Sequence, residues 1–150
     1  MQAVIMAGGK GTRLATLTKD EIPKPMVPVA GKPLLLWQVE RLKENGITDI
    51  IMVIGHLGDK IREYFGDGEK FGVAIRYFEE TEPLGTAGSF YYLKDMIHGD
   101  RFVMMSGDLF FDIDFQRMIN FHEEKGAVAM LFVHPNGHPF DSDLLVLDHG

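Results

Sequence analysis

Short apolar runs alternate along this chain with segments of helical periodicity, and that alternation constrains the fold more than any other feature. The runs at 3–6, 49–54 and 102–105 are nearly continuous, which indicates strands covered on both faces. Strands that alternate with helices build parallel βαβ units. We therefore predict an α/β fold, a Rossmann-like three-layer α/β/α arrangement with a mostly parallel sheet. The order of the strands in that sheet does not follow from the sequence.

The remaining predicted elements complete this alternation. Helices are expected after Pro33 up to Asn45-Gly46, around 61–65, at 88–97 and after Asp114, which can cap the helix that follows it. Further strands are expected at 73–78, 127–133 and 144–147. The whole of residues 1–150 is expected to form one domain.

Composition excludes several classes of protein. The formal net charge of −7 argues against nonspecific binding to nucleic acid or membranes. The chain has no cysteine, which excludes disulfides, thiol catalysis and a thiolate zinc site. No apolar run approaches the roughly 20 residues of a membrane span, and the first is too short for a signal peptide. We expect a cytoplasmic protein without nucleic-acid or membrane partners.

Four loops are candidates for ligand binding, because ligands of parallel sheets bind beyond the carboxyl ends of the strands. They are residues 7–32, 55–56, 79–86 and 106–112. The first is rich in glycine and carries cations, a combination suited to phosphate. It is not a dinucleotide fingerprint, since Leu14 stands where the last glycine belongs, and it lacks the G-K-[ST] of a P-loop.

Longer motifs identify a family. The pattern G-G-x-G-T-R-L from Gly8, followed by P-K-P-M-x-P-V-x-G-K-P-L from Pro23, resembles the sugar-1-phosphate nucleotidyltransferases. The segment E-T-E-P-L-G-T-A-G from Glu80 and Gly107-Asp108 at a strand end agree with it. The segment from Glu80 is most similar to the corresponding segment of GDP-mannose pyrophosphorylases and of mannose- or heptose-1-phosphate guanylyltransferases. The resemblance implies a nucleotide-diphospho-sugar transferase-like fold and an enzyme of nucleotide-sugar biosynthesis.

The implied reaction transfers a nucleotidyl group from a nucleoside triphosphate to a sugar 1-phosphate and releases pyrophosphate. Catalysis should rest on positioning and charge neutralisation, since the attacking phosphate is already an anion. The resemblance assigns Arg13 to the β- and γ-phosphates, Lys24 to the α-phosphate and Asp108 to Mg²⁺. The role of Lys10 stays open. The nucleotide-binding residues of the first loop are Ala7, Gly8, Gly9, Gly11 and Thr12.

Glu80 bears on the choice of base. Thymidylyl and uridylyl relatives carry glutamine here, and an amide both donates and accepts, whereas a carboxylate only accepts. The edge of guanine that carries N1–H and N2–H₂ offers only donors, so Glu80 favours GTP. Gly85 would lie against the base and Pro83 would shape the loop. Glu82 competes with Glu80 for the same role.

Alternatives remain open. The chain could be a non-catalytic nucleotide-binding or regulatory subunit of the same fold, or a thymidylyl- or uridylyl-transferring relative. His134, His138 and His149 are interpreted as parts of a polar loop rather than a metal site, and Asp112 as structural. The sugar-binding half and a second metal-binding aspartate of the family have no counterpart here. We therefore expect a truncated or naturally split protein that binds nucleotide without being able to finish the reaction alone. A homo-oligomer is compatible with the resemblance, and the sugar is not specified.

Overall fold

A computed structural model describes residues 1–9, 21–82, 84–135 and 145. Contacts divide the chain into two compact units, Met1–Phe115 and Gln116–Gly150, which are described separately. The first unit contains the sheet and the candidate site. Its elements are β1 (Gln2–Met6), η2 (Lys24–Met26), β2 (Pro28–Val29), β3 (Lys32–Pro33), α2 (Leu34–Glu44), β4 (Asp49–Ile54), α3 (Gly58–Phe65), η3 (Glu69–Phe71), β5 (Ala74–Glu79), α4 (Gly85–Leu93) and β6 (Phe102–Ser106).

The main sheet has four strands in the order β5-β4-β1-β6, and all three pairings are parallel. The register places Gln2 of β1 opposite Asp49 of β4 and Phe102 of β6. The chain moves outward from β1 through β4 to β5 and then returns across the sheet to β6. Because the direction of winding reverses there, β1 and β6 flank a topological switch point, where ligands of such sheets bind.

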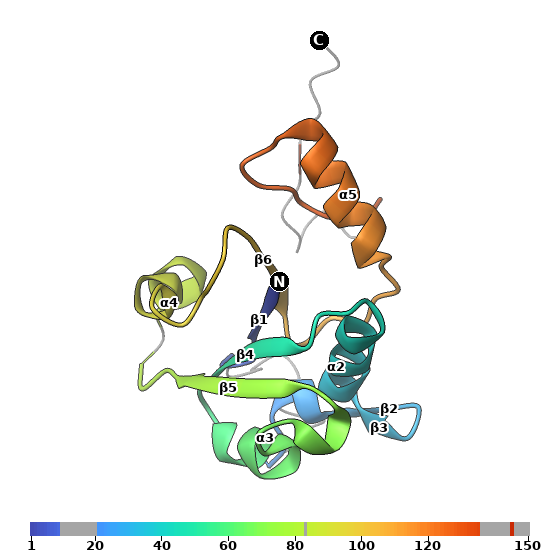
Figure 1. Ribbon diagram of the computed structural model, residues 1–150. Coiled ribbons are helices and arrows are strands. Elements are labelled where there is room, and N and C mark those ends of the chain that lie inside the picture. Colours follow the sequence, from blue (N-terminus) through green and yellow to red (C-terminus); the bar gives the residue numbers. More distant parts are fainter. Residues whose placement is uncertain (10–20, 83, 136–144, 146–150) are drawn as a thin grey trace. The chain divides into compact units, whose positions relative to one another are not determined.

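Helices cover both faces of the sheet, as the sequence predicts. Figure 1 shows α4 on one side and α2 and α3 on the other. Right-handed crossovers explain this, since reversing the direction of winding moves the crossover helix to the opposite face. On the α4 side, Val4, Ile51 and Val53 pack with Leu93. Successive strand residues point to opposite faces, so the intervening Ile5, Ile50, Met52 and Ile54, all fully buried, face α2 and α3.

Two predicted elements need correction. No strand forms at 127–133, where Val128 is fully exposed. Its sequence suits a strand, but an extended segment becomes a strand only by pairing. Helix α4 spans Gly85–Leu93 instead of 88–97. Met96 and Ile97 pack against the core from a turn closed by the carbonyl of Leu93. The predicted strand at 144–147 lies outside the described residues except for Leu145, which is not in a strand.

The second unit contains α5 (Phe115–Lys125), which starts at its boundary, directly after Asp114, where the sequence predicts a helix. His122 lies half-buried on this helix, and its Nδ1 has no hydrogen-bond partner among the described residues. Among the helices in the described ranges, none has the length and apolar character needed to cross a bilayer.

Candidate functional site

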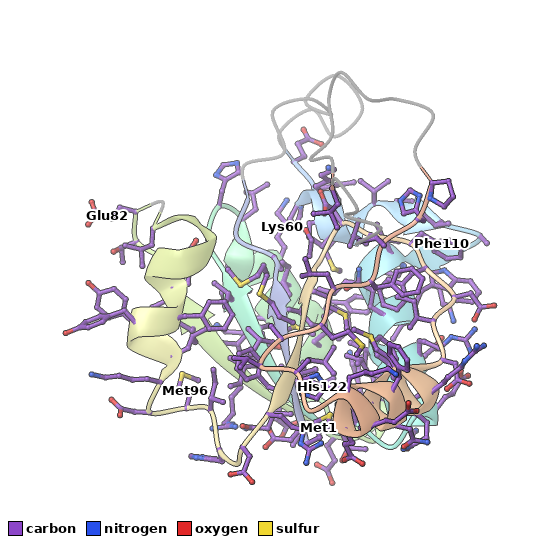
Figure 2. The ribbon with its side chains drawn as sticks, turned by 90° about the horizontal axis from the view of Figure 1, so that it is seen from above. Met1, Lys60, Glu82, Met96, Phe110 and His122 are labelled. Carbon is purple, nitrogen blue, oxygen red and sulfur yellow. The ribbon has the colours of Figure 1, made fainter. Side chains whose placement is uncertain are left out.

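A pocket of about 620 Å³ opens at the carboxyl ends of the strands. Figure 2 shows Met1 at the amino ends of the strands and Lys60 and Glu82 near the opposite ends. All four predicted ligand loops contribute to the pocket, because parallel strands end at one edge of the sheet. It is lined by Met6, Gly8, Gly9, Gly55, His56, Glu80, Thr81, Glu82, Gly85 and Ser106.

The floor of the pocket is made of backbone. The strand ladder continues into the loops: Ala7 N–H donates to the carbonyl of Val53 at 2.7 Å, and Gly107 N–H donates to that of Met6 at 2.8 Å. Gly8 and Gly55 cross in direct contact, since a Cβ on Gly55 would lie 2.8 Å from the oxygen of Gly8. Packing therefore requires glycine at Gly55, against the start of the Gly-rich loop, before any ligand binds.

Glu80 is held at the β5 side of the pocket. Its Oε1 accepts a hydrogen bond from the hydroxyl of Ser89, a fully buried residue of α4. The other oxygen, Oε2, lies against Gly8, 3.0 Å from where a Cβ would stand. The Ser89 hydroxyl also lies 3.0 Å from the carbonyl of Gly85, but its single proton serves one acceptor at a time. Glu82 also lines the pocket and is exposed.

Lys24 and Asp108 form an ion pair at the β6 side. Lys24 lies between two buried prolines, Pro23 and Pro25, and begins a single 3₁₀ turn. Burial alone would raise the pKa of Asp108, but hydrogen bonds from Lys24 and Ser106 and the charge of Lys24 lower it below the ordinary 3.8. Asp108 is therefore a carboxylate at neutral pH.

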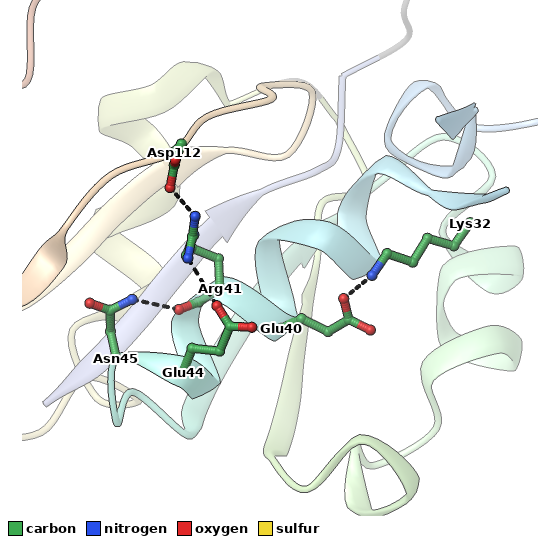
Figure 3. Close-up of polar contacts among 6 residues, drawn as sticks. All are labelled: Lys32, Glu40, Arg41, Glu44, Asn45 and Asp112. Carbon is green, nitrogen blue, oxygen red and sulfur yellow. Dashed lines mark hydrogen bonds and ion pairs between the residues drawn. The ribbon is translucent and has the colours of Figure 1, made fainter. Parts of the chain in front are cut away.

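The loop after β6 is tied to α2. Asp112 forms an ion pair with Arg41, which also contacts Glu44 at 3.0 Å (Figure 3). This ion pair agrees with the structural role predicted for Asp112, which stays a prediction. Lys32 pairs with Glu40 on the same helix and lies over the ring of Trp37.

Comparison with known proteins identifies the family. A family model described as nucleotidyl transferase matches residues 2–140. The chain belongs to this family. A structure of a putative glucose-1-phosphate thymidylyltransferase from Bacillus anthracis matches with a TM-score of 0.74 at 32% identity, covering 83% of this chain and 50% of that one. The chain therefore has the nucleotide-diphospho-sugar transferase fold, as its sequence predicts.

Curated members of the nucleotidyl transferase family include guanylyltransferases. The chain is 42% identical over 130 residues to D-glycero-α-D-manno-heptose 1-phosphate guanylyltransferase of Campylobacter jejuni, covering 87% of this chain and 57% of that protein. It is 36% identical over 152 residues to probable mannose-1-phosphate guanylyltransferase 1 of Oryza sativa, covering 99% and 42%. The predicted resemblance is confirmed. The chain spans about half the length of these relatives.

The structure describes some of the predicted site residues and not others. Ala7, Gly8, Gly9, Lys24, Glu80, Gly85 and Asp108 lie at the carboxyl edge of the sheet. Gly11, Thr12, Arg13 and Pro83 lie outside the described residues, as do Lys10, His138 and His149. His134 is described, and its Nδ1 lies 2.8 Å from the carbonyl of Pro135.

Three residues near Glu80 were not predicted as site residues. His56 and Thr81 line the pocket, and Ser89 holds Glu80. The position of His56 directly after β4, in one of the predicted ligand loops, is a signal that could have identified it. Ser89 gives no such signal, because it lies inside a helix and only the packing of α4 brings it to Glu80.

Proposed function

We propose that this chain is the nucleotide-binding portion of a sugar-1-phosphate nucleotidyltransferase that favours GTP. The observation that carries the proposal is the arrangement of charges at the carboxyl edge of the sheet. An acceptor, Glu80, lines the pocket after β5, and the Gly8–Gly9 backbone lines it after β1. Asp108, which pairs with Lys24, is bonded by Ser106, the residue of β6 that lines the same pocket. An acidic acceptor suits a base, and a cation suits phosphate. The family membership and the guanylyltransferase relatives support the same assignment.

In the proposed reaction, a phosphate oxygen of the sugar 1-phosphate attacks the α-phosphorus of GTP. The bond from this phosphorus to the oxygen bridging to the β-phosphorus breaks, and that oxygen leaves with pyrophosphate. No proton has to be removed from the nucleophile. The barrier is charge repulsion, which reaches several kcal/mol, roughly 4 per pair of unit charges at 4 Å and an effective dielectric of 20. Lys24 would offset it at the α-phosphate and Arg13 at the leaving pyrophosphate.

The residues present fit a Mg²⁺ ion that arrives with the triphosphate. Mg²⁺ in such sites binds one or two carboxylates together with substrate phosphates, and Asp108 is an ionised, half-buried carboxylate. Within the described residues, no group of three or more His, Asp or Glu side chains forms a ready-made metal site. When bound, the ion would neutralise phosphate charge. Without it, Lys24 is the cation that pairs with Asp108, and phosphate would give Lys24 a second partner.

The remaining predictions are carried into this proposal on the resemblance alone. Gly11 and Thr12 would contact the nucleotide, and Pro83 would shape the loop beside the base. The cytoplasmic location and the homo-oligomer stay predictions. A thymidylyl- or uridylyl-transferring enzyme and a non-catalytic nucleotide-binding subunit are the competing functions.

Pyrophosphate release tests the proposal. We expect release only when GTP, Mg²⁺ and one of a panel of sugar 1-phosphates (mannose, heptose or glucose) are all present in an assay of the complete protein, and none after addition of EDTA. Lys24→Met should lower kcat/KM about 100- to 1,000-fold, the cost of removing one preorganised charge contact. Lys32→Met is the matched control, because Lys32 is also a half-buried lysine paired with a carboxylate.

Each competing function predicts a different result in the same assay. Release with dTTP or UTP in preference to GTP would show that the base assignment is wrong. Binding of GTP without release for any sugar in the panel would overturn the enzyme reading in favour of the non-catalytic subunit.

A further inference from the structure

Gln38 is a buried amide on α2 that contacts the turn carrying Asp108. Its side chain is 2% exposed. Its Nε2 donates to the carbonyls of Ser106 at 3.0 Å and Leu109 at 2.6 Å. These two carbonyls flank Gly107-Asp108 on both sides, so one NH₂ group bridges the two ends of the turn.

The amide of Gln38 is only partly satisfied at this buried position. Its Oε1 is buried and has no hydrogen-bond partner among the described residues. An unpaired buried polar atom destabilises the folded state, because it has given up its hydrogen bond to water. The neighbouring buried residues of α2, Leu35, Val39 and Leu42, are apolar. An apolar residue would remove the cost at Oε1 but would lose both donors. The two hydrogen bonds that the amide donates to the Ser106–Leu109 turn therefore explain why a polar residue stands here.

The turn is fixed on its other side as well. Gly107 N–H donates to the carbonyl of Met6, and a Cβ on Gly107 would lie 3.1 Å from that of Ala7. Gly107 is thus pressed against the start of the Gly-rich loop. Gln38 closes the turn from the α2 side, and the hydroxyl of Ser106 holds the carboxylate itself. The backbone that supports Asp108 is therefore held by β1 within the sheet and by α2 from one face of it.

We propose that Gln38 is a positioning residue for Asp108: its amide fixes the Ser106–Leu109 turn so that the carboxylate is aimed at the Mg²⁺ of the bound nucleotide. This inference rests on the proposed function, in which Asp108 binds Mg²⁺. Arg41, one turn further along α2, makes the contrasting contact. It pairs with Asp112 at the surface, beyond the turn (Figure 3), and therefore holds the loop without holding Asp108.

Mn²⁺ binding, followed by electron paramagnetic resonance, tests the proposal without turnover. The probe is Mn²⁺ with α,β-methylene GTP, whose α–β bond cannot be cleaved. Gln38→Met keeps the side-chain length and removes the donors. We expect it to weaken Mn²⁺ binding about 10- to 100-fold, the usual effect of losing a partner that orients a metal ligand. The matched control Arg41→Ala should leave Mn²⁺ affinity unchanged.

Asp108→Asn separates the two proposals. If it abolishes Mn²⁺ binding and Gln38→Met does not weaken it, the positioning role is wrong and the metal role stands. If Asp108→Asn leaves Mn²⁺ binding unchanged, the metal role in the proposed function is wrong. A Gln38→Met protein with a lower melting temperature but unchanged Mn²⁺ affinity would show that Gln38 serves stability alone and would overturn the inference.

A measurement on the unaltered protein covers the case in which Gln38→Met does not fold. Binding of Mg²⁺ and α,β-methylene GTP should shift the side-chain amide resonance of Gln38 in NMR spectra. The amide of Gln116, which donates to Asn120 on α5 at 2.9 Å, is the reference that should not shift. An unmoved Gln38 resonance, with the nucleotide bound, would contradict the proposal.

Discussion

Glu80 and Glu82 are the same residue type two positions apart, and the structure gives them different surroundings. Glu80 is half-buried, accepts a hydrogen bond from Ser89 and packs against Gly8, whereas Glu82 lines the same pocket but is exposed. A side chain that reads a base has to be held in one orientation, because a freely rotating carboxylate loses entropy on binding. Within the proposed function, these surroundings favour Glu80 over Glu82 as the residue that would contact the base.

Replacing Glu80 by glutamine should reduce GTP affinity about tenfold or more and leave dTTP affinity nearly unchanged. The carboxylate can accept two hydrogen bonds from guanine, and the amide presents a donor against a donor. Isothermal titration calorimetry with GTP and dTTP measures both. Glu82→Gln is the matched control and should change neither affinity. The reverse pattern, with Glu82→Gln reducing GTP affinity, would assign the base to Glu82.

At the scale of elements, the loops after β1 and β4 meet without a side chain between them. Gly55 lies on the backbone of Gly8, and Gly107 on that of Ala7. The loops that follow the three neighbouring strands β4, β1 and β6 therefore stay side by side and pack through their backbones. The sequence marks all three glycines, but their mutual contact depends on the strand order, which no local pattern contains.

Gly55→Ala should therefore destabilise the folded state by about 1–3 kcal/mol, the usual cost of forcing extra atoms into a packed site. The added methyl group would stand 2.8 Å from a backbone oxygen that cannot move aside easily. Gly9→Ala is the control, since a Cβ there meets nothing within 4 Å. Urea unfolding without ligand compares them. Equal stability of both variants would mean that the two loops are not in contact.

Tyr77 on β5 offers a pH-dependent test of the same sheet. Burial raises its pKa to about 12, opposed by Arg62 and aided by Asp67, and its hydroxyl donates to the carbonyl of Gly66 at 2.6 Å. The raised pKa favours the neutral phenol in the folded state. Its contribution to stability is therefore complete below pH 10, the ordinary pKa, and is lost as the pH rises from 10 to 12.

Tyr77→Phe should lower the free energy of unfolding by about 1 kcal/mol at pH 8, the net value of one hydrogen bond. It should also flatten the loss of stability between pH 10 and 12. Urea unfolding at a series of pH values measures both effects. Tyr91→Phe, at an exposed tyrosine of α4, should not change stability at pH 8. An unchanged slope in Tyr77→Phe would show that Tyr77 does not titrate with folding.

For the whole molecule, the sequence predicts the layers of strands and helices well, but it does not predict the strand order or the contacts between distant residues. Continuous apolar runs identify buried strands because a strand covered on both faces needs an apolar side chain at nearly every position. The strand at 49–54 has the predicted bounds. The strand order depends on which distant runs meet, as Gln2 and Phe102 do. The same limit explains the wrong strand at 127–133, whose apolar residues suit a strand but have no described partner, and the missed contact between Ser89 and Glu80.

The return of the chain to β6 also has a consequence in time. The β5–β4–β1 side of the sheet can form once residues up to Glu79 have left the ribosome, whereas β1 acquires its second neighbour only with Phe102–Ser106. Contacts that join distant residues carry a larger loop-closure cost and form late. During synthesis the second edge of β1 is exposed, and an unpaired edge invites pairing with other chains. The edge of the sheet that carries Asp108 therefore assembles after the β5–β4–β1 side, and a nucleotide bound as proposed would stabilise only chains that have already passed this stage.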